Sequence, residues 1–265
     1  MEALNSAARW IGNIPPIRAV RQARYRRSFH QSADGWPRFY GLFPSREEAL
    51  AAAPSTRLVG YDHETVVDVS LHRMSRIWTS DYPVVYWLLR ILAQGQTLVD
   101  LGGHVGTKYR AWSRYLPLPD DFRWVVCDVP AMRDAGRRLN APNPHLRFTS
   151  RRDEIDGSDI LLTSGVLQYM EGDLERILGS CTERPRHLLM NKVPTHTSPD
   201  VYTLENLVRS TVPYRVFQKE RLVEALRSLG YEKLDEWTVL ESSVRVPFTP
   251  LGEPVHLGFY FQRPD

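Results

Sequence analysis

The sequence predicts an α/β protein built on a mostly parallel sheet of seven strands, with helices on both faces. From residue 97 onward, apolar runs typical of buried strands alternate with segments typical of helices, which indicates parallel strands joined by helical crossovers. The last two apolar runs, 233–240 and 255–263, have no helical segment between them, so we expect an antiparallel hairpin at the C-terminal end. We expect residues 1–80 to form a basic, helical N-terminal extension, serving as a cap or an oligomer contact, and residues 81–265 to form the main domain.

Composition and charge exclude several classes of protein. Hydrophobic residues make up 42% of the 265 positions and charged residues 25%, as is typical of a soluble globular protein. The net charge of +3 is too small to indicate nucleic-acid binding. No stretch approaches the roughly 20 apolar residues of a membrane span, and the start lacks the features of a secretion signal, so we expect a cytoplasmic protein. The two cysteines lack metal-ligand spacing, and no cluster of histidines or carboxylates is apparent, so we expect no metal.

Arginines dominate the first part of the chain. Arg21, Arg24 and Arg27 recur at three-residue spacing, so a helix places them along one flank. This flank is either a solvated face or a contact for anionic lipid or substrate. The extension is therefore a homodimer contact, a substrate lid or a weak membrane-surface patch, and the pattern does not choose among these partners.

Two helices are expected ahead of the sheet. Ser45 opens a capping-box pattern, and the alanine-rich run after it predicts a short helix. Residues 66–77 fit no single pattern. Residues 81–96 predict a helix with Asp81 as its N-cap and Gly95 as its stop.

Strands and helices then alternate along the chain. The remaining expected strands are 97–101, 123–129, 146–150, 159–164 and 187–193. The helical segments expected around them are 109–116, 131–140, 173–181 with Asp173 as cap, and 217–231. Ligands of such sheets bind outside the carboxyl ends of the strands, where the strand order reverses.

A glycine-rich loop follows the strand 97–101. Gly102 and Gly103 allow positive φ angles or a close approach to the backbone, and Gly106 lets the next helix pack tightly against its strand. The spacing does not match the G-x-G-x-x-G of dinucleotide-binding proteins, which argues against NAD(P). His104 stands where a third closely spaced glycine is expected.

Two acids end consecutive strands of the predicted sheet. Asp100 stands in an apolar context where an unpaired carboxylate is costly, so it accepts backbone N–H bonds from the loop or meets a cationic ligand. Asp128 ends the next strand, where an acid can accept hydrogen bonds from both ribose hydroxyls of an adenosine. The alternative for Asp128 is an ordinary turn acid. Both acids fall on the same edge of the sheet.

The segment VDLGGHVG resembles the first motif of the class I S-adenosylmethionine-dependent methyltransferases, an acid and an apolar residue followed by G-x-G-x-G. Asp100, Gly102 and Gly106 match this motif, Gly103 fills its variable slot, and His104 departs from its central glycine. The resemblance implies a Rossmann-like sheet and S-adenosyl-L-methionine as the cofactor.

The same resemblance implies the other cofactor-binding residues. Asp128 matches the family's ribose-binding acid, with Val129 beside it. In the family, the end of the fourth strand lines both cofactor and substrate. The residues there are Ser164, Gly165, Gln168 and Tyr169, and the further aromatic neighbours for the sulfonium are Tyr109 and Trp112.

A narrower resemblance extends along most of the chain. The pieces YGLFPSREEA, GYD, DLGGHVGTKY, SGVLQY, MNKVP and PYRVFQKERLVEALRSLGYEKLDEW are similar, in this order, to a family of predicted methyltransferases often encoded among bacterial surface-polysaccharide (O-antigen or capsule) genes. The family's L-N-R-x-P carries an arginine where this chain has Lys192, a swap that is not conservative where bidentate contacts matter. The resemblance implies a small-molecule or glycan acceptor.

Four residues are candidate catalytic groups under this resemblance. His104 is a base, by its location and near-neutral titration range, a support for the loop and the cofactor, or a bystander without a role. His196 lies in the polar loop after the fifth strand, on the substrate side. Lys192 binds an anionic acceptor or is a solvated strand-end charge, and Tyr169 places a hydroxyl near the cofactor or packs. The histidines to which we assign no role are His63, His72, His145, His187 and His256.

Three functions remain open. The first is O-methylation of a sugar or glycan precursor of a surface polysaccharide, by in-line transfer from S-adenosylmethionine. The second is binding of the same cofactor without transfer, because a fold does not fix a function. The third is a nucleotide-sugar or NAD(P)-linked enzyme, which the missing G-x-G-x-x-G disfavours.

Overall fold

The computed structural model describes residues 15–32, 35–36, 38–55, 58–59, 76–207 and 210–264 of the chain. The segment GYD (60–62) and most of the ambiguous segment 66–77 lie outside these ranges. In the part that is described, no helix is long and apolar enough to cross a membrane.

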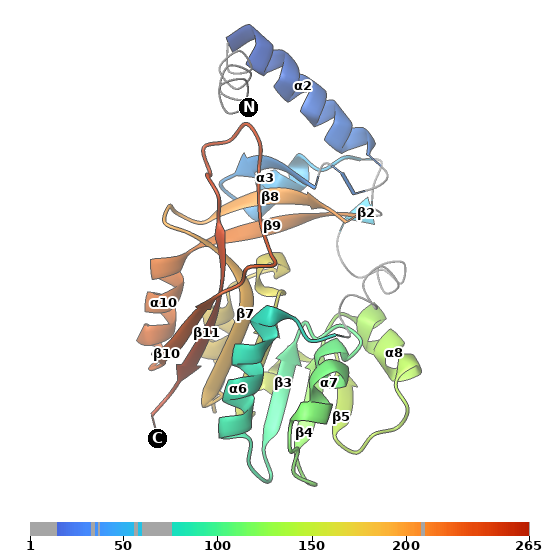
Figure 1. Ribbon diagram of the computed structural model, residues 1–265, viewed down its shortest axis with the longest axis vertical. Coiled ribbons are helices and arrows are strands. Elements are labelled where there is room, and N and C mark those ends of the chain that lie inside the picture. The colour runs from blue at the N-terminus through green and yellow to red at the C-terminus, as the bar shows by residue number, and fades with distance from the viewer. Residues whose placement is uncertain are drawn as a thin grey trace.

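Strands and helices alternate through most of the described chain (Figure 1). The strands are β1 (Phe39–Phe43), β2 (Leu58–Val59), β3 (Thr97–Leu101), β4 (Arg123–Cys127), β5 (Leu146–Thr149), β6 (Ile160–Ser164), β7 (His187–His196), β8 (Val201–Asn206), β9 (Ser210–Gln218), β10 (Glu232–Thr238) and β11 (Val255–Gln262). The α-helices are α2 (Pro15–Gln31), α3 (Arg46–Ala51), α6 (Tyr82–Ile91), α7 (Thr107–Trp112), α8 (Pro130–Leu139), α9 (Leu174–Ser180) and α10 (Lys219–Ser228). The short 3₁₀ helices are η1 (Thr79–Asp81), η2 (Ser113–Tyr115), η3 (Arg152–Ile155) and η4 (Leu167–Tyr169).

The predicted Rossmann-like fold is confirmed. The central sheet has the order β5-β4-β3-β6-β7-β11-β10, in which β3 to β7 are parallel and β11 and β10 form the antiparallel end. The chain passes from β3 to β4 and β5 on one side and then returns to β6 on the other side of β3. The strand order therefore reverses between β3 and β6, where sheets of this kind bind their ligands.

Both faces of the central sheet are buried, because successive side chains of a strand point to opposite faces. Val99 and Leu161 pack on the face covered by α9 and α10. Leu98 and Leu162, one position away on the same two strands, pack on the face covered by α6 and α7. A strand buried on both sides reads as a continuous apolar run, which is why these strands were predictable.

A second sheet, which the sequence analysis did not predict, adjoins the carboxyl end of β7. Its order is β1-β8-β9-β2, with β1, β8 and β9 antiparallel and β2 parallel to β9. The end of β7 joins the two sheets, since Thr195 and His196 pair with Phe217 and Gln218 of β9. The N-terminal region thus contributes strands as well as helices, and its strand β1 pairs with β8 from the second half of the chain.

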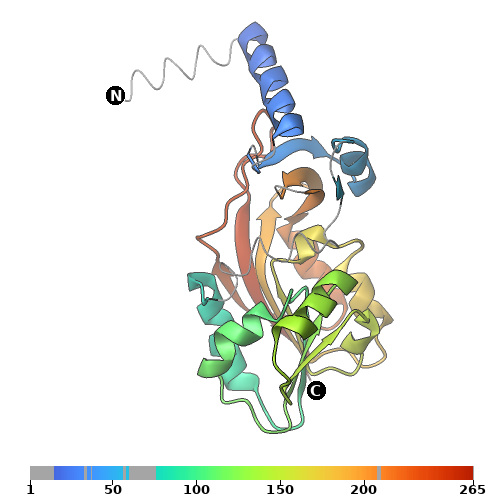
Figure 2. The same ribbon diagram turned by 90° about the vertical axis from the view of Figure 1, so that its right-hand side faces the viewer.

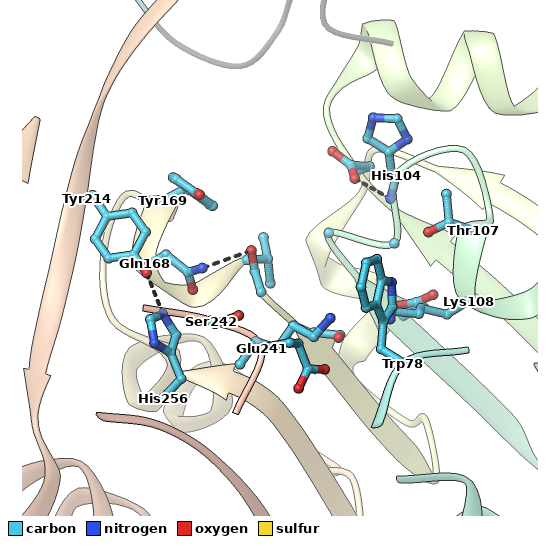
Figure 3. A pocket seen from close by; sticks show the side chains of 18 of the residues that line it. Trp78, His104, Thr107, Lys108, Gln168, Tyr169, Tyr214, Glu241, Ser242 and His256 are labelled. Atoms are coloured by element: carbon cyan, nitrogen blue, oxygen red, sulfur yellow. Dashed lines mark hydrogen bonds between the residues drawn. The ribbon is translucent and has the colours of Figure 1, made fainter. Parts of the chain in front are cut away.

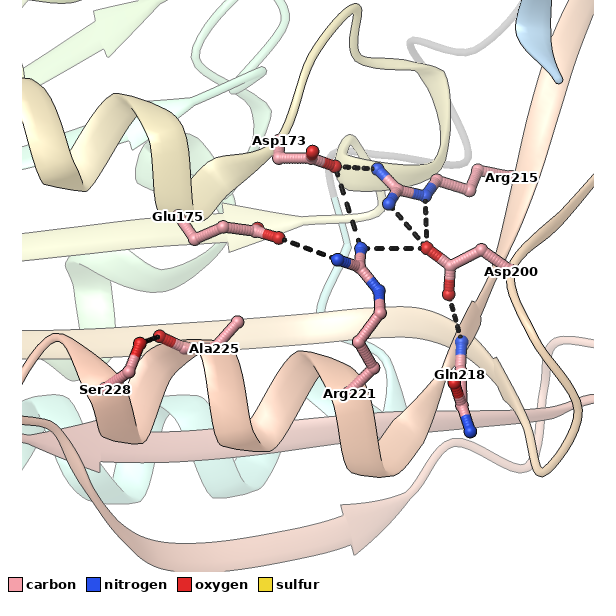
Figure 4. A network of polar contacts seen from close by, with 8 residues as sticks. All are labelled: Asp173, Glu175, Asp200, Arg215, Gln218, Arg221, Ala225 and Ser228. Carbon is pink, nitrogen blue, oxygen red and sulfur yellow. Dashed lines mark hydrogen bonds and ion pairs between the residues drawn. The ribbon is translucent and has the colours of Figure 1, made fainter.

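An ion-pair network fixes the β8–β9 hairpin to the helical layer of the central sheet (Figure 4). Arg215 of β9 pairs with Asp173, just before α9, and with Asp200, just before β8. Arg221 of α10 binds the same Asp200 at 2.9 Å and Glu175 of α9 at 3.2 Å. The Arg215 side chain is only 8% exposed, so these contacts are screened less than surface ion pairs.

The three expected helix caps differ in outcome. The Ser45 oxygen accepts a hydrogen bond from the backbone N–H of Glu48 at 3.1 Å, which confirms the cap of α3. Asp81 and Asp173 occupy the N-cap positions of α6 and α9, but neither side chain makes a capping hydrogen bond. The two N-cap positions are as predicted, but each carboxylate pairs with a cation from another element instead of capping its helix, Lys108 for Asp81 and Arg215 for Asp173.

Helix α2 projects from the end of the molecule that carries the second sheet (Figures 1 and 2). It is attached near its C-terminal end by the buried Phe29 and by the Tyr25 hydroxyl, which donates to the Phe39 carbonyl at 2.7 Å. Arg24 and Arg27 are exposed, and Arg21 lies over the ring of Phe248 at 5.8 Å. Its role as a dimer, lid or membrane contact stays a prediction.

Candidate functional site

A cavity of about 250 Å³ opens at the carboxyl ends of the central strands, at the point where the strand order reverses (Figure 3). One wall is the loop after β3 with the ends of β4 and β6. The other wall comes from η1, β7, the second sheet and the connection between β10 and β11. The lining residues are Arg38, Trp78, Asp100, Gly102, Gly103, His104, Thr107, Lys108, Asp128, Ser164, Gly165, Val166, Gln168, Tyr169, Lys192, Tyr214, Glu241, Ser242, Ser243 and His256.

Glycines are required in the loop after β3 for two different reasons. Gly102 has φ +72°, and a Cβ there would stand 2.2 Å from a methyl carbon of Val166. At Gly103 a Cβ would stand 2.5 Å from the carboxyl carbon of Asp100. Any side chain at Gly103 would therefore displace the Asp100 carboxylate from its place beside the cavity.

Asp100 is a buried acid with incomplete hydrogen bonding. Its side chain is 1% exposed, and Oδ2 accepts a hydrogen bond from the Trp124 indole at 3.3 Å. Oδ1 has no hydrogen-bond partner among the described residues. Burial raises the pKa of Asp100 to about 7, against the opposing effects of the Trp124 hydrogen bond and the Lys108 charge. A ligand with a positive charge or an N–H donor would bind the unpartnered oxygen and stabilise the ionised form of this acid.

His104 stands where the G-x-G-x-G motif has its central glycine, and its backbone is left-handed. Its φ is +58°, in the left-handed region that a non-glycine residue rarely adopts. Its backbone N–H donates to Asp128 Oδ2 at 2.7 Å, and the Val129 N–H donates to Oδ1 at 2.7 Å. The Asp128 carboxylate therefore holds the loop after β3 against the end of β4. Figure 3 shows this hydrogen bond and the His104 ring on the opposite side of the site from His256 and Tyr214.

The His104 imidazole is buried and neutral near pH 7. Burial lowers its pKa to about 4. Neither ring nitrogen has a hydrogen-bond partner in the described ranges. A group with this pKa is a weak general base at neutral pH.

The end of β6 lines the cavity beside the loop after β3. Gly165 has φ +75°, and its carbonyl accepts a hydrogen bond from the Gln168 side chain at 3.2 Å. Ser164 Oγ and Gln168 Oε1 are buried and lack partners within the described part of the chain. The Tyr169 hydroxyl is engaged, since it donates to Glu205 Oε2 at 2.6 Å.

Lys108, which lines the cavity, forms a buried ion pair with Asp81. The ammonium lies 2.8 Å and 3.0 Å from the two carboxylate oxygens, with side chains 9% and 0% exposed. Asp81 also accepts from the Trp78 backbone and from the side chains of Trp112 and Asn191. The pair therefore ties η1, α7 and β7 together around one carboxylate.

The far wall carries the other polar groups of the site. Lys192, with φ +61°, lies in β7 with its ammonium 5.5 Å from the centre of the Trp78 ring. Glu241 accepts hydrogen bonds from the backbone N–H and the hydroxyl of Ser80. The Tyr214 hydroxyl and His256 Nε2 are hydrogen-bonded at 2.9 Å (Figure 3).

Most of the predicted site residues line the cavity, but several do not. Tyr109 packs with Trp124 in the core between α7 and the sheet, and Gly106 packs its backbone against Phe148 with φ +80°. Val129 joins a small cluster under α8. His196 is the last residue of β7 and not part of the loop predicted for it; it accepts a hydrogen bond from the Ser198 N–H and does not line the cavity. Within the described ranges, no group of three or more histidines, cysteines or carboxylates is placed to hold a metal ion.

Sequence reasoning missed much of the far wall. Arg38, Trp78, Tyr214, Glu241 and His256 come from segments between 38 and 256 that only the tertiary structure brings together. One feature of the sequence could have identified Lys108 as a site residue. It is one of only four lysines in an arginine-rich chain, and it stands in the first turn after the glycine loop.

No family model and no curated protein sequence matches the chain. Among solved structures, the chain is similar to the (4+2)-cyclase SpnF, with 13% identity over 77% of this chain and 94% of that one and a TM-score of 0.51. It is also similar to a phosphoethanolamine N-methyltransferase 2 from Haemonchus contortus, in complex with phosphomonomethylethanolamine and S-adenosylhomocysteine, with 11% identity over 76% and 58% and a TM-score of 0.51. A third is the 1,6-didemethyltoxoflavin-N1-methyltransferase of Burkholderia thailandensis, with 20% identity over 84% and 92% and a TM-score of 0.47.

At these identities the similarity to SpnF and to the nematode enzyme shows the fold and no more. One of these two proteins is named for a cyclisation and the other for methyl transfer. The function must therefore be argued from the site.

Proposed function

We propose that the chain is an S-adenosylmethionine-dependent methyltransferase that binds its cofactor in the cavity at the end of β3. The observation that carries the proposal is the state of Asp100, a buried carboxylate with one oxygen unpartnered among the described residues and the backbone of Gly103 pressed against it. The methionine part of the cofactor carries an ammonium and a sulfonium, and either charge would stabilise the ionised acid.

The other residues of the loop side fit the rest of the cofactor. Asp128 retains lone pairs beyond those used by the two backbone N–H groups and would accept the ribose hydroxyls. Ser164 and Gln168 offer polar atoms without partners in the described chain. When bound, the cofactor supplies an electrophilic methyl group. The residues of this chain bind it, orient it and keep water away from it.

We propose a hydroxyl of a sugar or glycan precursor as the methyl acceptor. The far side of the cavity combines aromatic rings, from Trp78, Tyr169 and Tyr214, with the hydrogen-bonding groups of Glu241 and Ser242. Sugars present apolar ring faces and many hydroxyls, so such a wall suits them. The similarity to the surface-polysaccharide methyltransferases noted in the sequence supports the same acceptor class.

Incubation with methyl-labelled S-adenosylmethionine and a panel of nucleotide sugars and methyl glycosides tests the proposal. We expect label in at least one sugar with the wild-type chain, a large loss with Asp100→Asn, and no loss with Asp153→Asn, an exposed acid paired with Arg151. Cofactor binding without transfer to any acceptor class would favour a binding module. Recovery of NAD(P) from the purified protein would favour a nicotinamide-linked enzyme.

A further inference from the structure

The backbone of Lys192 is strained by a positive φ angle, and such strain indicates a functional role. It is one of three non-glycine residues with positive φ in the described chain, together with His104 and Phe248. Its side chain lies along the end of β6, since a Cβ built on Gly165 would come within 3.9 Å of Lys192 Cδ. Strain of this kind costs about 1–3 kcal/mol and tends to cluster at functional sites.

The Lys192 ammonium faces the cavity without a carboxylate partner in the described part of the chain. The nearby charges come from three elements, Lys108 of α7, Asp81 of η1 and Glu241 after β10. Both acids are already engaged, Asp81 by Lys108 and Glu241 by the N–H and hydroxyl of Ser80. The Trp78 ring is the remaining contact.

These surroundings favour the neutral amine. Burial and the charge of Lys108 lower the pKa of Lys192 to about 8, although Asp81 and Glu241 oppose the shift. With this pKa, roughly a tenth of the Lys192 side chains are free amines at pH 7 and about half at pH 8, whereas an ordinary lysine, with a pKa of about 10.4, is almost fully protonated at both. A second positive charge in the cavity would favour the amine further.

We propose that Lys192 is the general base that removes the proton from the acceptor hydroxyl, an inference that rests on the proposed methyl transfer. Lys192 Nζ takes the hydroxyl proton and becomes an ammonium. The acceptor oxygen forms a bond to the methyl carbon with a lone pair, the carbon–sulfur bond breaks, and its electron pair stays on sulfur. The ammonium then returns its proton to solvent.

The other titratable groups of the cavity suit this role less well. The Tyr169 hydroxyl donates to Glu205, and burial raises the pKa of Tyr214 well above its ordinary value. Burial lowers the pKa of His104 and of His256 to about 4. Each of these groups is therefore a weak acceptor of a proton near pH 8, or is already engaged.

The chain allows a direct test of the amine, because it contains only four lysines. In a protein labelled with ¹³C-lysine, we expect one of the four side-chain Cε–Hε signals, the one absent from Lys192→Arg, to titrate at about pH 8. A Lys192 signal that titrates above pH 10 would overturn the proposal.

Kinetics on the sugar acceptor supply the second readout. We expect Lys192→Met to lower kcat by about 10² to 10⁴ while S-adenosylhomocysteine still binds. Lys192→Arg should be equally impaired, and Lys233→Met, whose ammonium pairs with Glu236 away from the cavity, should match the wild type. Wild-type activity should rise with pH to a plateau above about 8.

Two results would overturn the role of Lys192 as base. Full activity of Lys192→Arg would show that the site needs a positive charge rather than a base. Full activity of Lys192→Met would show that it needs neither. In both cases, retained S-adenosylhomocysteine binding and methyl transfer would leave the proposed function standing. A wild-type chain that binds no S-adenosylhomocysteine would refute the proposed function itself.

Discussion

Replacing Lys108 with methionine leaves the Asp81 carboxylate buried without its cation. Asp81 is 0% exposed and keeps only neutral donors, from the Trp78 backbone and the side chains of Trp112 and Asn191. Breaking a buried ion pair on one side costs about 3–5 kcal/mol, because the remaining charge is uncompensated. For a domain of this size the melting temperature falls by roughly 2 to 4 °C for each kcal/mol, or about 6 to 20 °C in total.

Thermal and urea unfolding at pH 7, followed by circular dichroism, measure this loss. The double variant Asp81→Asn with Lys108→Met should recover part of it, because both charges are then absent. Arg147→Met is the matched control, since its ion pair with Glu154 involves an Arg147 side chain that is 56% exposed and should contribute less than about 1 kcal/mol. If Lys108→Met destabilised the chain no more than this control, the reasoning on the buried pair would be wrong.

Three further predictions follow from the cavity and the network around it. Because burial raises the pKa of Asp100 to about 7, this acid makes the folded state less stable as the pH rises from about 4 to 7. Asp100→Asn should remove that contribution in pH-dependent melts, and a ligand-free pH profile identical to that of the wild type would contradict the raised pKa of Asp100. Gly102→Ala should cost about 2–5 kcal/mol through its left-handed backbone and the clash with Val166, whereas Gly179→Ala, with nothing within 4 Å, should not destabilise. Arg215→Met removes the central cation of the ion-pair network in Figure 4 and should loosen the β8–β9 hairpin, which would be measured as faster amide exchange in β8 and β9. Unchanged exchange there would show that the network does not stabilise the hairpin.

The central sheet was predictable because a strand buried on both faces is a continuous run of apolar residues, which can be recognised from its own sequence. The strand 97–101 has the bounds expected for it, since an apolar run ends there at an acid and two glycines. The strands of the second sheet could not be recognised from such a pattern. Its strand β1 pairs with β8 across more than 150 residues, and most of β9 (Ser210–Gln218) lies before residue 217, in a stretch for which the sequence predicts no element.

The same distinction applies to the candidate site, where one side was predictable from local sequence and the other was not. The loop side follows consecutive strands, so residues such as Asp100, Gly102 and Asp128 could be found from spacing and resemblance, and they do line the cavity. The far wall could not be found in this way. Asp81 was read as a helix cap because its cation, Lys108, lies 27 positions further on, and His256 lies within a strand with no motif around it.

Titration calorimetry with S-adenosylhomocysteine tests the central claim most directly. We predict one binding site per chain. Asp128→Ala should weaken binding about 10- to 100-fold, the equivalent of losing a charge-assisted hydrogen bond. Asp134→Ala, which changes a partly exposed acid of α8 paired with Arg133, should bind as the wild type does. A folded wild-type chain that gives no heat of binding, or an Asp128→Ala variant that binds equally well, would contradict the account.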